Sequence, residues 1–239
     1  MSSLKWNSSA QTHTGYVRQH NEDAYLDARE QCLWVVADGM GGHNAGDLAS
    51  QIIIENLVTF HPQQDMTKSV DAIEQRLIAA NTQCRKNRTG SHTIMGSTVA
   101  VLYAQDEFCF FLWAGDSRIY RLRNGSLSQM TEDHSLVQEM VNMGEISQTE
   151  ALNHPSSNVI TRAIGVRDQL FVDIEYATAD KGDRFLLCSD GLSKELSAED
   201  IAQTMSSTPV EQASKTLVQQ ALAKGGSDNI TAIVVQVGY

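Results

Sequence analysis

The sequence predicts an α+β fold in which helices pack outside β-sheets. Two segments with helical periodicity follow the first strand-like run, hairpins dominate the middle of the chain, and two further helices lie near its end. Consecutive hairpins imply antiparallel strands. No repeat, low-complexity segment or linker divides the 239 residues, so we expect a single domain over residues 1–239.

The first clear strand is the apolar run from Cys32 to Ala37. It leads directly into Asp38, which is followed by glycines at positions 39, 41 and 42. Burying a bare carboxylate is costly, so Asp38 requires an ion pair, hydrogen bonds or a metal ion. Residues 7–25 before this strand are polar, and their charged run at 18–23 has the composition of a solvated loop.

Helical spacing of apolar residues predicts two helices over about 48–60 and 70–84. A third is expected to begin with Asp133 as its N-cap and to carry Leu136 to Val141. Ser147 and Glu150 form a capping-box pattern for a short helix that ends before His154-Pro155. The last two helices are expected to start at Ser197 and at 208–211, the second ending at Gly225-Gly226.

From Ser97 onward the pattern is that of β-strands joined by short polar turns. Asn124-Gly125 marks a hairpin. The last strand is apolar on both faces, which is typical of a central position in a sheet. The expected strands cover 98–103, 108–114, 119–122, 158–163, 171–176, 184–188 and 230–237.

Aspartates recur at the ends of these apolar runs. Asp38, Asp116 and Asp190 each follow one, whereas Asp228 precedes the last strand. If that strand runs opposite to those ending at Asp38 and Asp190, one sheet edge holds all four carboxylates. A single such aspartate is most often a turn residue or helix cap. Four in similar settings, which would raise one another's pKa if left alone, indicate a divalent cation.

The donor set selects the kind of metal. The candidate ligands are oxygen atoms, with no paired histidine or cysteine, which suits Mg²⁺ or Mn²⁺ rather than zinc. Other phosphate-handling motifs are absent from the sequence. Gly41 and Gly46 have P-loop spacing, but Asp47 stands where the lysine is required, and no GxSxG motif occurs.

The composition narrows the expected partners and compartment. Acidic residues outnumber basic ones by 29 to 18, and the net charge of −11 argues against nucleic acid or an anionic membrane as a partner. The four cysteines are far apart and suit reduced thiols. The N-terminal sequence lacks the apolar region of a signal peptide, and no apolar stretch approaches the ~20 residues of a membrane span. We therefore expect a cytoplasmic protein.

Eight short motifs occur together and in a fixed order. They are RQHNED (18–23), DGMGG (38–42), GST (96–98), GDSRIY (115–120), TEDHS (131–135), TRAIG (161–165), SDGL (189–192) and DNIT (228–231). Each is weak alone. Together, over nearly the whole chain, they resemble those of the bacterial PPM, or type 2C, metal-dependent serine/threonine protein phosphatases.

The resemblance implies a four-layer α-β-β-α sandwich with a small helical flap over about 136–157. It also implies two Mn²⁺ or Mg²⁺ ions and a third, weaker one. Asp38 would bridge the two metals, and Arg18 would grip the substrate phosphate. The other implied metal ligands are the Gly39 carbonyl, Asp190 and Asp228 directly, Glu22 and Asp23 through water, and Asp116 at the third metal.

The implied reaction is hydrolysis of phosphoserine and phosphothreonine in proteins by a bridging water that the metals activate. One position departs from the pattern, because animal members of the family carry a histidine, proposed as general acid, where Met40 stands. His43 is the candidate proton donor or substrate contact, weighed against a surface loop histidine. His134 is expected to have a structural role at its helix start.

Two alternatives stay open on the sequence alone. The metal centre could act on a small-molecule phosphate, or the chain could be a non-catalytic module that binds phosphorylated proteins, although such a module is expected to have lost metal ligands. By analogy with bacterial relatives, the partners would be phosphoproteins, including a Ser/Thr kinase and its targets or an FHA-domain protein of type VI secretion. The chain is expected to be a monomer.

Overall fold

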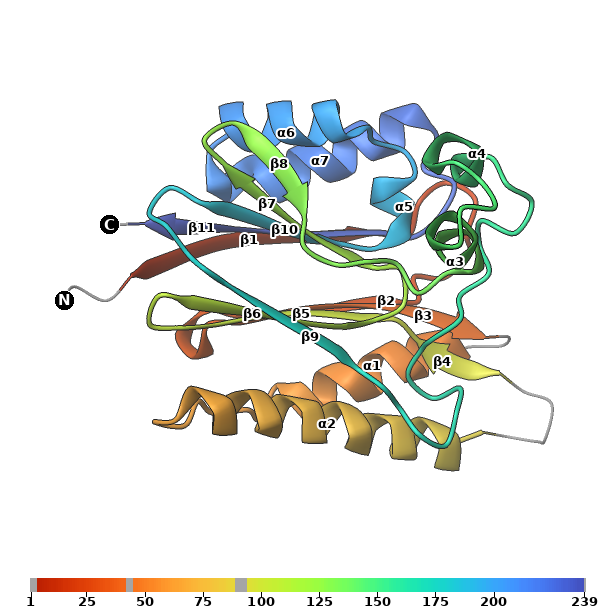
Figure 1. Ribbon diagram of the computed structural model, residues 1–239, viewed down its shortest axis with the longest axis horizontal. Coiled ribbons are helices and arrows are strands. Elements are labelled where there is room, and N and C mark those ends of the chain that lie inside the picture. Colours follow the sequence, from red (N-terminus) through yellow and green to blue (C-terminus); the bar gives the residue numbers. More distant parts are fainter. Residues whose placement is uncertain (1–3, 42–44, 89–93, 239) are drawn as a thin grey trace.

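The computed structural model describes residues 4–41, 45–88 and 94–238. Two antiparallel sheets face each other at its centre (Figure 1). The first sheet has the order β1 (Lys5–His13), β11 (Ile230–Gly238), β10 (Arg184–Cys188), β7 (Arg118–Arg123) and β8 (Ser126–Gln129). The second has the order β2 (Asp23–Ala28), β3 (Leu33–Gly41), β5 (Val99–Gln105), β6 (Phe108–Ala114) and β9 (Asp173–Thr178), with β4 (Met95–Ser97) pairing β3.

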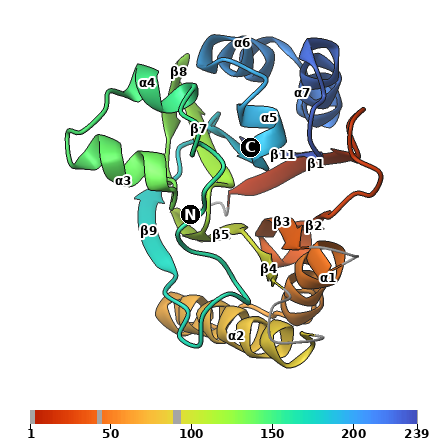
Figure 2. The same ribbon diagram turned by 90° about the vertical axis from the view of Figure 1, so that its right-hand side faces the viewer.

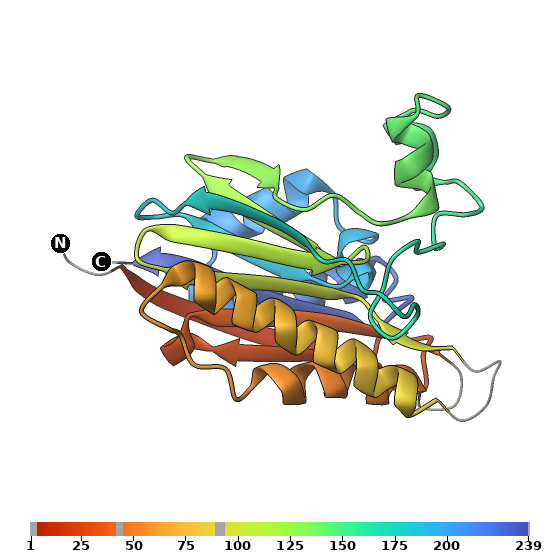
Figure 3. The same cartoon turned by 60° about the horizontal axis from the view of Figure 1, so that its bottom comes forward.

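Helices cover the outer face of each sheet and complete four layers (Figure 1). Two lie against the sheet of β3, namely α1 (Ala45–Leu57) and α2 (Met66–Lys86), and two lie against the other sheet, namely α6 (Ala198–Ser207) and α7 (Val210–Lys224). Short elements are η1 (Arg29–Gln31) and α5 (Asp190–Ser193). The remaining helices, α3 (Leu136–Asn142) and α4 (Gln148–Leu152), project beside one end of the sandwich (Figures 2 and 3).

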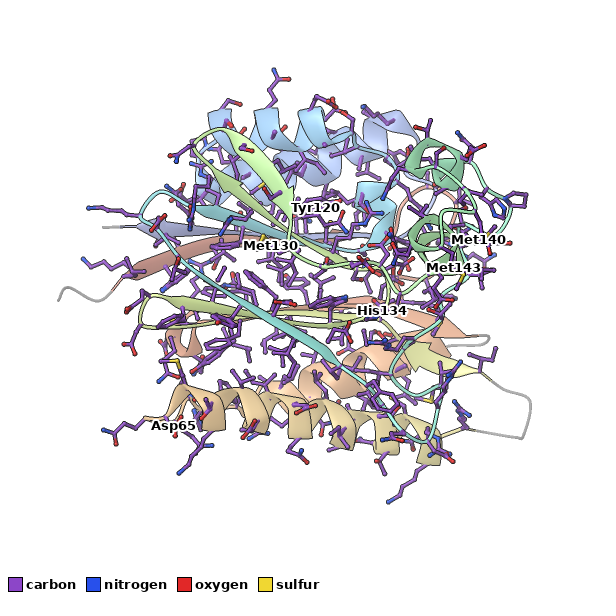
Figure 4. All side chains as sticks on the ribbon, viewed as in Figure 1. Asp65, Tyr120, Met130, His134, Met140 and Met143 are labelled. Atoms are coloured by element: carbon purple, nitrogen blue, oxygen red, sulfur yellow. The ribbon has the colours of Figure 1, made fainter. Side chains whose placement is uncertain are left out.

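Three apolar clusters hold these layers together. One lies between the sheet of β3 and helices α1 and α2, and another lies between β10, β11 and helices α6 and α7. The third fills the space between the two sheets, where Trp34 and Phe185 are fully buried and Met130 packs beside them (Figure 4). Burial of this apolar surface is the main force that fixes the sheets face to face. The predicted α+β sandwich with helices outside is confirmed.

The N-terminal segment departs from the prediction. Residues 7–25, for which the polar composition indicates no strand, contain most of β1 and the start of β2, whereas residues 18–22 of the charged run lie between these strands without regular structure. β1 pairs with β11 along its whole length, from Lys5 opposite Gly238 to His13 opposite Ile230. Its serine, threonine and asparagine residues hide this from a composition-based analysis, because the stabilising partner is more than 200 residues away in the sequence.

Two predictions in the middle of the chain are wrong. Residues 158–163 do not form a strand. Ile160 makes an isolated bridge with Ser135, and the bridge of the following Ile164 is to Ser97, in a separate part of the chain. Asp133 does not cap α3. Ser135 is the N-cap, and its hydroxyl accepts from the Gln138 N–H, while Asp133 binds Arg118.

Other boundaries shift for local reasons. Helix α2 starts at Met66 because the Asp65 side chain caps it by accepting from the Thr67 N–H (Figure 4). Strand β3 continues through Asp38 to Gly41, since Gly39 pairs with Ser97 of β4. The capping boxes at Ser147 and Ser197 are confirmed.

No helix among the described residues is long and apolar enough to cross a membrane.

Candidate metal centre

Asp23 and Asp38 lie directly opposite each other on neighbouring antiparallel strands, β2 and β3. Like charges in this position repel, so the pair favours a cation between or beside them. The expected single sheet edge is therefore wrong. Asp23 and Asp38 belong to one sheet, whereas Asp190 and Asp228 flank β10 and β11 of the other. The carboxylates meet at one end of the sandwich, across the two sheets.

Asp23 joins the two sheets. Its Oδ2 accepts hydrogen bonds from Ser189 Oγ at 2.8 Å and Thr231 Oγ1 at 2.6 Å, both from the opposite sheet. Its Oδ1 is buried and has no hydrogen-bond partner in the part of the chain that the structure describes. Burial first, and then the charges of Asp190 and Asp228, raise the pKa of Asp23 to about 7. An unpartnered buried carboxylate oxygen is costly and points to an absent cation.

Asp38 has the most strongly perturbed carboxyl group of the site. Burial raises its pKa well above the ordinary value, and the neighbouring charges of Asp23, Asp190 and Asp116 raise it further. Its N–H donates to Thr98 Oγ1 at 3.2 Å, and Thr98 Oγ1 lies 2.7 Å from Ser117 Oγ. These hydroxyls fix the strand, and no ion pair to the Asp38 carboxylate is found among the described residues.

Gly39 is required where α1 approaches β3. A Cβ atom on Gly39 would lie 2.1 Å from the Gly46 carbonyl oxygen and 2.6 Å from that of Glu22. The Gly39 N–H donates to the Glu22 carbonyl at 3.1 Å, which ties the charged run at 18–23 to the strand. Burial is the largest cause that raises the pKa of the Glu22 side chain. Glu22 is thus held beside Asp38 by the backbone rather than lying in a solvated loop.

Asp116 lies in the tight turn between β6 and β7. It is 5% exposed, and its Oδ1 has no hydrogen-bond partner. Burial first, and then Asp190 and Asp133, raise the pKa of Asp116 to about 7. His134 braces this turn, because its Nδ1 accepts from the Gly115 N–H at 3.1 Å (Figure 4). His134 therefore supports the site structurally, as expected.

Asp190 starts α5, immediately after β10. Its Oδ2 accepts a hydrogen bond of 2.5 Å from Lys194 Nζ, one helical turn later. Burial would lower the pKa of Lys194, but the Asp190 carboxylate outweighs it, so the pKa is raised. The positive partner of Asp190 is thus the ammonium group of Lys194.

Asp228 is held in the same way. Arg18 makes a bidentate contact in which its Nε and Nη2 atoms each donate to one carboxylate oxygen of Asp228 at 2.7 Å. The hydrogen bond to Asp228 is the main cause that raises the pKa of Arg18. The neighbouring Asn229 side chain bonds the Glu22 N–H, the Thr14 carbonyl and the His20 carbonyl. The guanidinium group of Arg18, which is expected to bind the substrate phosphate, is therefore bound to Asp228, a predicted metal ligand.

The residues present fit divalent cations by their chemistry. Six carboxylates and a backbone carbonyl offer hard oxygen donors, and two of the carboxylates keep a buried oxygen without a partner among the described residues. In the part of the chain that the structure describes, no three His, Cys, Asp or Glu side chains are already arranged as ligands of one ion. Arg18 and Lys194 instead hold two of the carboxylates. Metal binding would have to displace or rearrange these two cations.

A cavity of about 420 Å³ separates the centre from helices α3 and α4. Asp116, Asp190 and Lys194 line one side, while Gln138 of α3 and Leu152 of α4 line the other. A substrate that reaches the carboxylates from this side would therefore contact the helices of the predicted flap.

Some predicted and some unpredicted residues need separate mention. His43 and Gly42 lie outside the described residues. Lys194 was missed, although its spacing of four residues from Asp190 on one helix was a usable signal. Ser189, Thr231 and Asn229 lie inside recognised motifs, but nothing in the sequence shows that they bind across to Asp23 and Glu22.

Comparison with known proteins adds independent information. The family model for protein phosphatase 2C matches residues 11–225. Serine/threonine protein phosphatase PstP of Mycobacterium tuberculosis H37Rv is 38% identical over 237 residues, which cover 96% of this chain but 44% of that relative. The chain therefore spans less than half of PstP. Serine/threonine phosphatase stp of Listeria monocytogenes EGD-e is 35% identical, with 94% of this chain and 93% of the relative covered.

Two solved structures are similar over nearly their full length. PppA, described as a key regulatory component of T6SS in Pseudomonas aeruginosa, is 40% identical with a TM-score of 0.91, covering 98% of this chain and 99% of that one. The catalytic domain of PstP in complex with two manganese ions is 33% identical with a TM-score of 0.87, covering 99% and 100%.

Proposed function

The chain belongs to the protein phosphatase 2C family, and we propose that it is a metal-dependent phosphatase that hydrolyses phosphoserine and phosphothreonine in proteins. One observation carries the proposal. Acidic side chains from both sheets converge at one end of the sandwich, where the buried Oδ1 atoms of Asp23 and Asp116 have no partner. The similarity to a phosphatase solved with two manganese ions supports the same conclusion.

We assign the metal ligands from this geometry and from the family pattern. Asp38, the Gly39 carbonyl, Asp190 and Asp228 would hold two Mn²⁺ or Mg²⁺ ions, Glu22 and Asp23 would act through water, and Asp116 would serve a third ion. When bound, such ions lower the pKa of water and draw charge from phosphoryl oxygens. The hydroxyl groups of Ser189 and Thr231 hold the Asp23 carboxylate in place.

Arg18 is the proposed phosphate contact. Its planar guanidinium can donate to two oxygens at once, which the contact with Asp228 already demonstrates. The side chain is 55% exposed, so it can turn from Asp228 toward a substrate phosphate without disturbing packed neighbours. If Asp228 held a metal ion, the Arg18 guanidinium would be free to bind this second anion.

The source of the proton for the leaving oxygen is a separate proposal. Met40 cannot supply it, because a thioether carries no acidic proton. Met40 instead lies opposite Gly96 in the β3–β4 pair. His43 remains the proposed donor or substrate contact, and substitution by glutamine should lower kcat for substrates with a poor leaving group more than for p-nitrophenyl phosphate.

The proposed substrates are phosphoproteins of a serine/threonine kinase system, including the kinase and its targets. An FHA-domain protein is a specific candidate, because the chain resembles PppA, a regulatory component of T6SS. Residues 136–157 would act as the flap that shapes access, in keeping with their place along the cavity beside Asp190. We also propose a single domain that works as a cytoplasmic monomer, which the free cysteines and the self-contained cores support.

The test is a phosphatase assay on the purified full chain. Phosphate release from a phosphothreonine peptide should require Mn²⁺ or Mg²⁺ and should be abolished by Asp38→Ala. Catalytic efficiency on the peptide should exceed that on small metabolite phosphates. Absence of metal-dependent release, or release that Asp38→Ala leaves intact, would refute the proposal.

A further inference from the structure

Lys194 bridges a predicted metal ligand and the turn at the end of the predicted flap. Its Nζ donates to Asp190 Oδ2 at 2.5 Å and to Asn158 Oδ1 at 2.6 Å. The Lys194 N–H also donates to the Asp190 carbonyl at 2.8 Å, so the lysine is fixed at the end of α5. The two short side-chain contacts join the metal centre to the chain that returns from α4.

Asn158 ends the turn formed by residues 155–158, which leads from α4 back toward the sandwich. The next residue, Val159, accepts a hydrogen bond at 2.9 Å from the N–H of Leu136, the first residue of α3. The turn and the start of the flap are therefore attached to each other. A change at Asn158 reaches the part of the chain that lines the cavity over Asp190.

A divalent ion and the Lys194 ammonium require the same carboxylate. Coulomb repulsion between a metal ion on Asp190 and an ammonium group a few ångströms away opposes binding of the metal. The Lys194 side chain is 41% exposed, so it is free to swing into solvent once the carboxylate is taken. Leaving Asp190 also carries Nζ away from Asn158, because one nitrogen atom makes both contacts.

We propose that Lys194 is a built-in competitor for the metal at Asp190 and that metal binding there releases the turn 155–158. The inference rests on the proposed function, since it requires a metal ion at Asp190. Lys194 then has a positioning role. It raises the metal concentration needed to occupy Asp190, and its contact with Asn158 is lost when the metal binds.

Metal affinity provides the first test. The full chain is titrated with Mn²⁺ in a calorimeter as wild type, Lys194→Met and Lys224→Met. The Lys224 control loses a comparable half-exposed ion pair, with Asp200 at 2.6 Å, away from the centre. We expect Lys194→Met to bind Mn²⁺ about tenfold more tightly than wild type, because a like charge has been removed. The Lys224 variant should bind as wild type does.

Backbone hydrogen exchange in peptides covering residues 144–160 provides the second test. In the wild type, Mn²⁺ should speed exchange in this region. In Lys194→Met, exchange should be fast with or without metal. Asn158→Ala separates the two roles, because it should give fast exchange without metal while raising the affinity for Mn²⁺ less than Lys194→Met does, since the ammonium group is still present.

The outcomes distinguish this inference from the proposed function. Equal or weaker Mn²⁺ binding by Lys194→Met, or metal-independent exchange of 144–160 in the wild type, overturns the role of Lys194 and leaves the phosphatase proposal standing. A wild-type chain that binds no Mn²⁺ overturns both.

Discussion

The two sheets contribute carboxylates of different character to the same centre. In the described part of the chain, Asp23 and Asp38, on β2 and β3, have no cationic partner, and Asp23 keeps a buried oxygen without a hydrogen bond. Asp190 and Asp228, beside β10 and β11, are each bound by a cation of the chain, Lys194 and Arg18. A metal ion would therefore meet no competing cation at Asp23 and Asp38 among the described residues. At Asp190 and Asp228 it would have to displace Lys194 and Arg18.

This difference shows two ways in which the chain lowers the repulsion within a cluster of acids. Unpaired carboxyls respond to burial by holding protons, as the pKa of about 7 for Asp23 and Asp116 indicates. The more exposed carboxyls instead recruit flexible basic side chains. Substitutions in the two groups of acids test this difference, and their expected effects on catalysis decrease from Asp38→Ala to Arg123→Ala.

The largest effect is expected from Asp38→Ala. Loss of the proposed bridging ligand should lower kcat/KM on a phosphothreonine peptide by at least about 10³-fold, which corresponds to about 4 kcal/mol. The metal-free variant should melt no lower than metal-free wild type, because a repelling carboxylate has been removed. The control is Asp65→Ala, which removes the α2 cap and should lower the melting temperature without changing kcat/KM.

Arg18→Ala should have the next largest effect. It removes a charged two-pronged phosphate contact, so kcat/KM should fall about 10- to 100-fold. The affinity for Mn²⁺ should rise, because Asp228 loses its internal cation. Arg18→Lys should restore only part of the activity, since a lysine cannot donate from two fixed nitrogens. Unchanged kcat/KM in Arg18→Ala would remove this residue from the phosphate site.

The unpaired half predicts a pH dependence of stability. Burial raises the pKa of Asp23 and Asp116 to about 7 in the folded protein, whereas an unfolded aspartate titrates near ~3.9. Between about pH 4 and 7 the folded state therefore binds more protons than the unfolded state, and stability falls as the pH rises. The melting temperature of EDTA-treated protein should decrease across this window.

Two controls check that the carboxylates cause this slope. Asp116→Asn should flatten it, and Mn²⁺ should raise the melting temperature more at pH 8 than at pH 5, because the metal requires ionised ligands. A melting temperature that rises between pH 5 and pH 8 without metal would contradict the assignment of unpaired, proton-binding carboxyls.

The smallest effect on catalysis is expected where an acid has a permanent partner. Asp183 is 1% exposed and accepts from Arg123 Nε at 2.8 Å and NH2 at 2.6 Å. Arg123→Ala removes the charged partner of this buried carboxylate, which keeps its hydrogen bond from the Asp180 N–H at 2.8 Å, and should lower the free energy of unfolding by about 2 kcal/mol. It should leave kcat/KM and Mn²⁺ affinity within about twofold of wild type. Loss of metal binding in this variant would show that the two kinds of acid are not separate.

Much of the fold was predictable because local signals agree with the final environment. The apolar runs at 108–114 and 184–188 coincide with β6 and β10, and the hairpin at Asn124-Gly125 has both residues at positive φ. Strand β1 was not predictable in this way. Its polar residues become a strand because β11 supplies hydrogen-bond partners along the whole of it.

The sequence by itself determined which chemical groups are available to the candidate centre, namely acidic side chains beside apolar strands. Their oxygen atoms favour a metal that prefers oxygen ligands. Only the tertiary structure decided how those acids are shared between two sheets and which of them are neutralised by Arg18 and Lys194. That distribution depends on strand order and on contacts such as Ser189 with Asp23, 166 residues apart. Contacts at such separations are set by the packing of complete layers, and no local pattern encodes them.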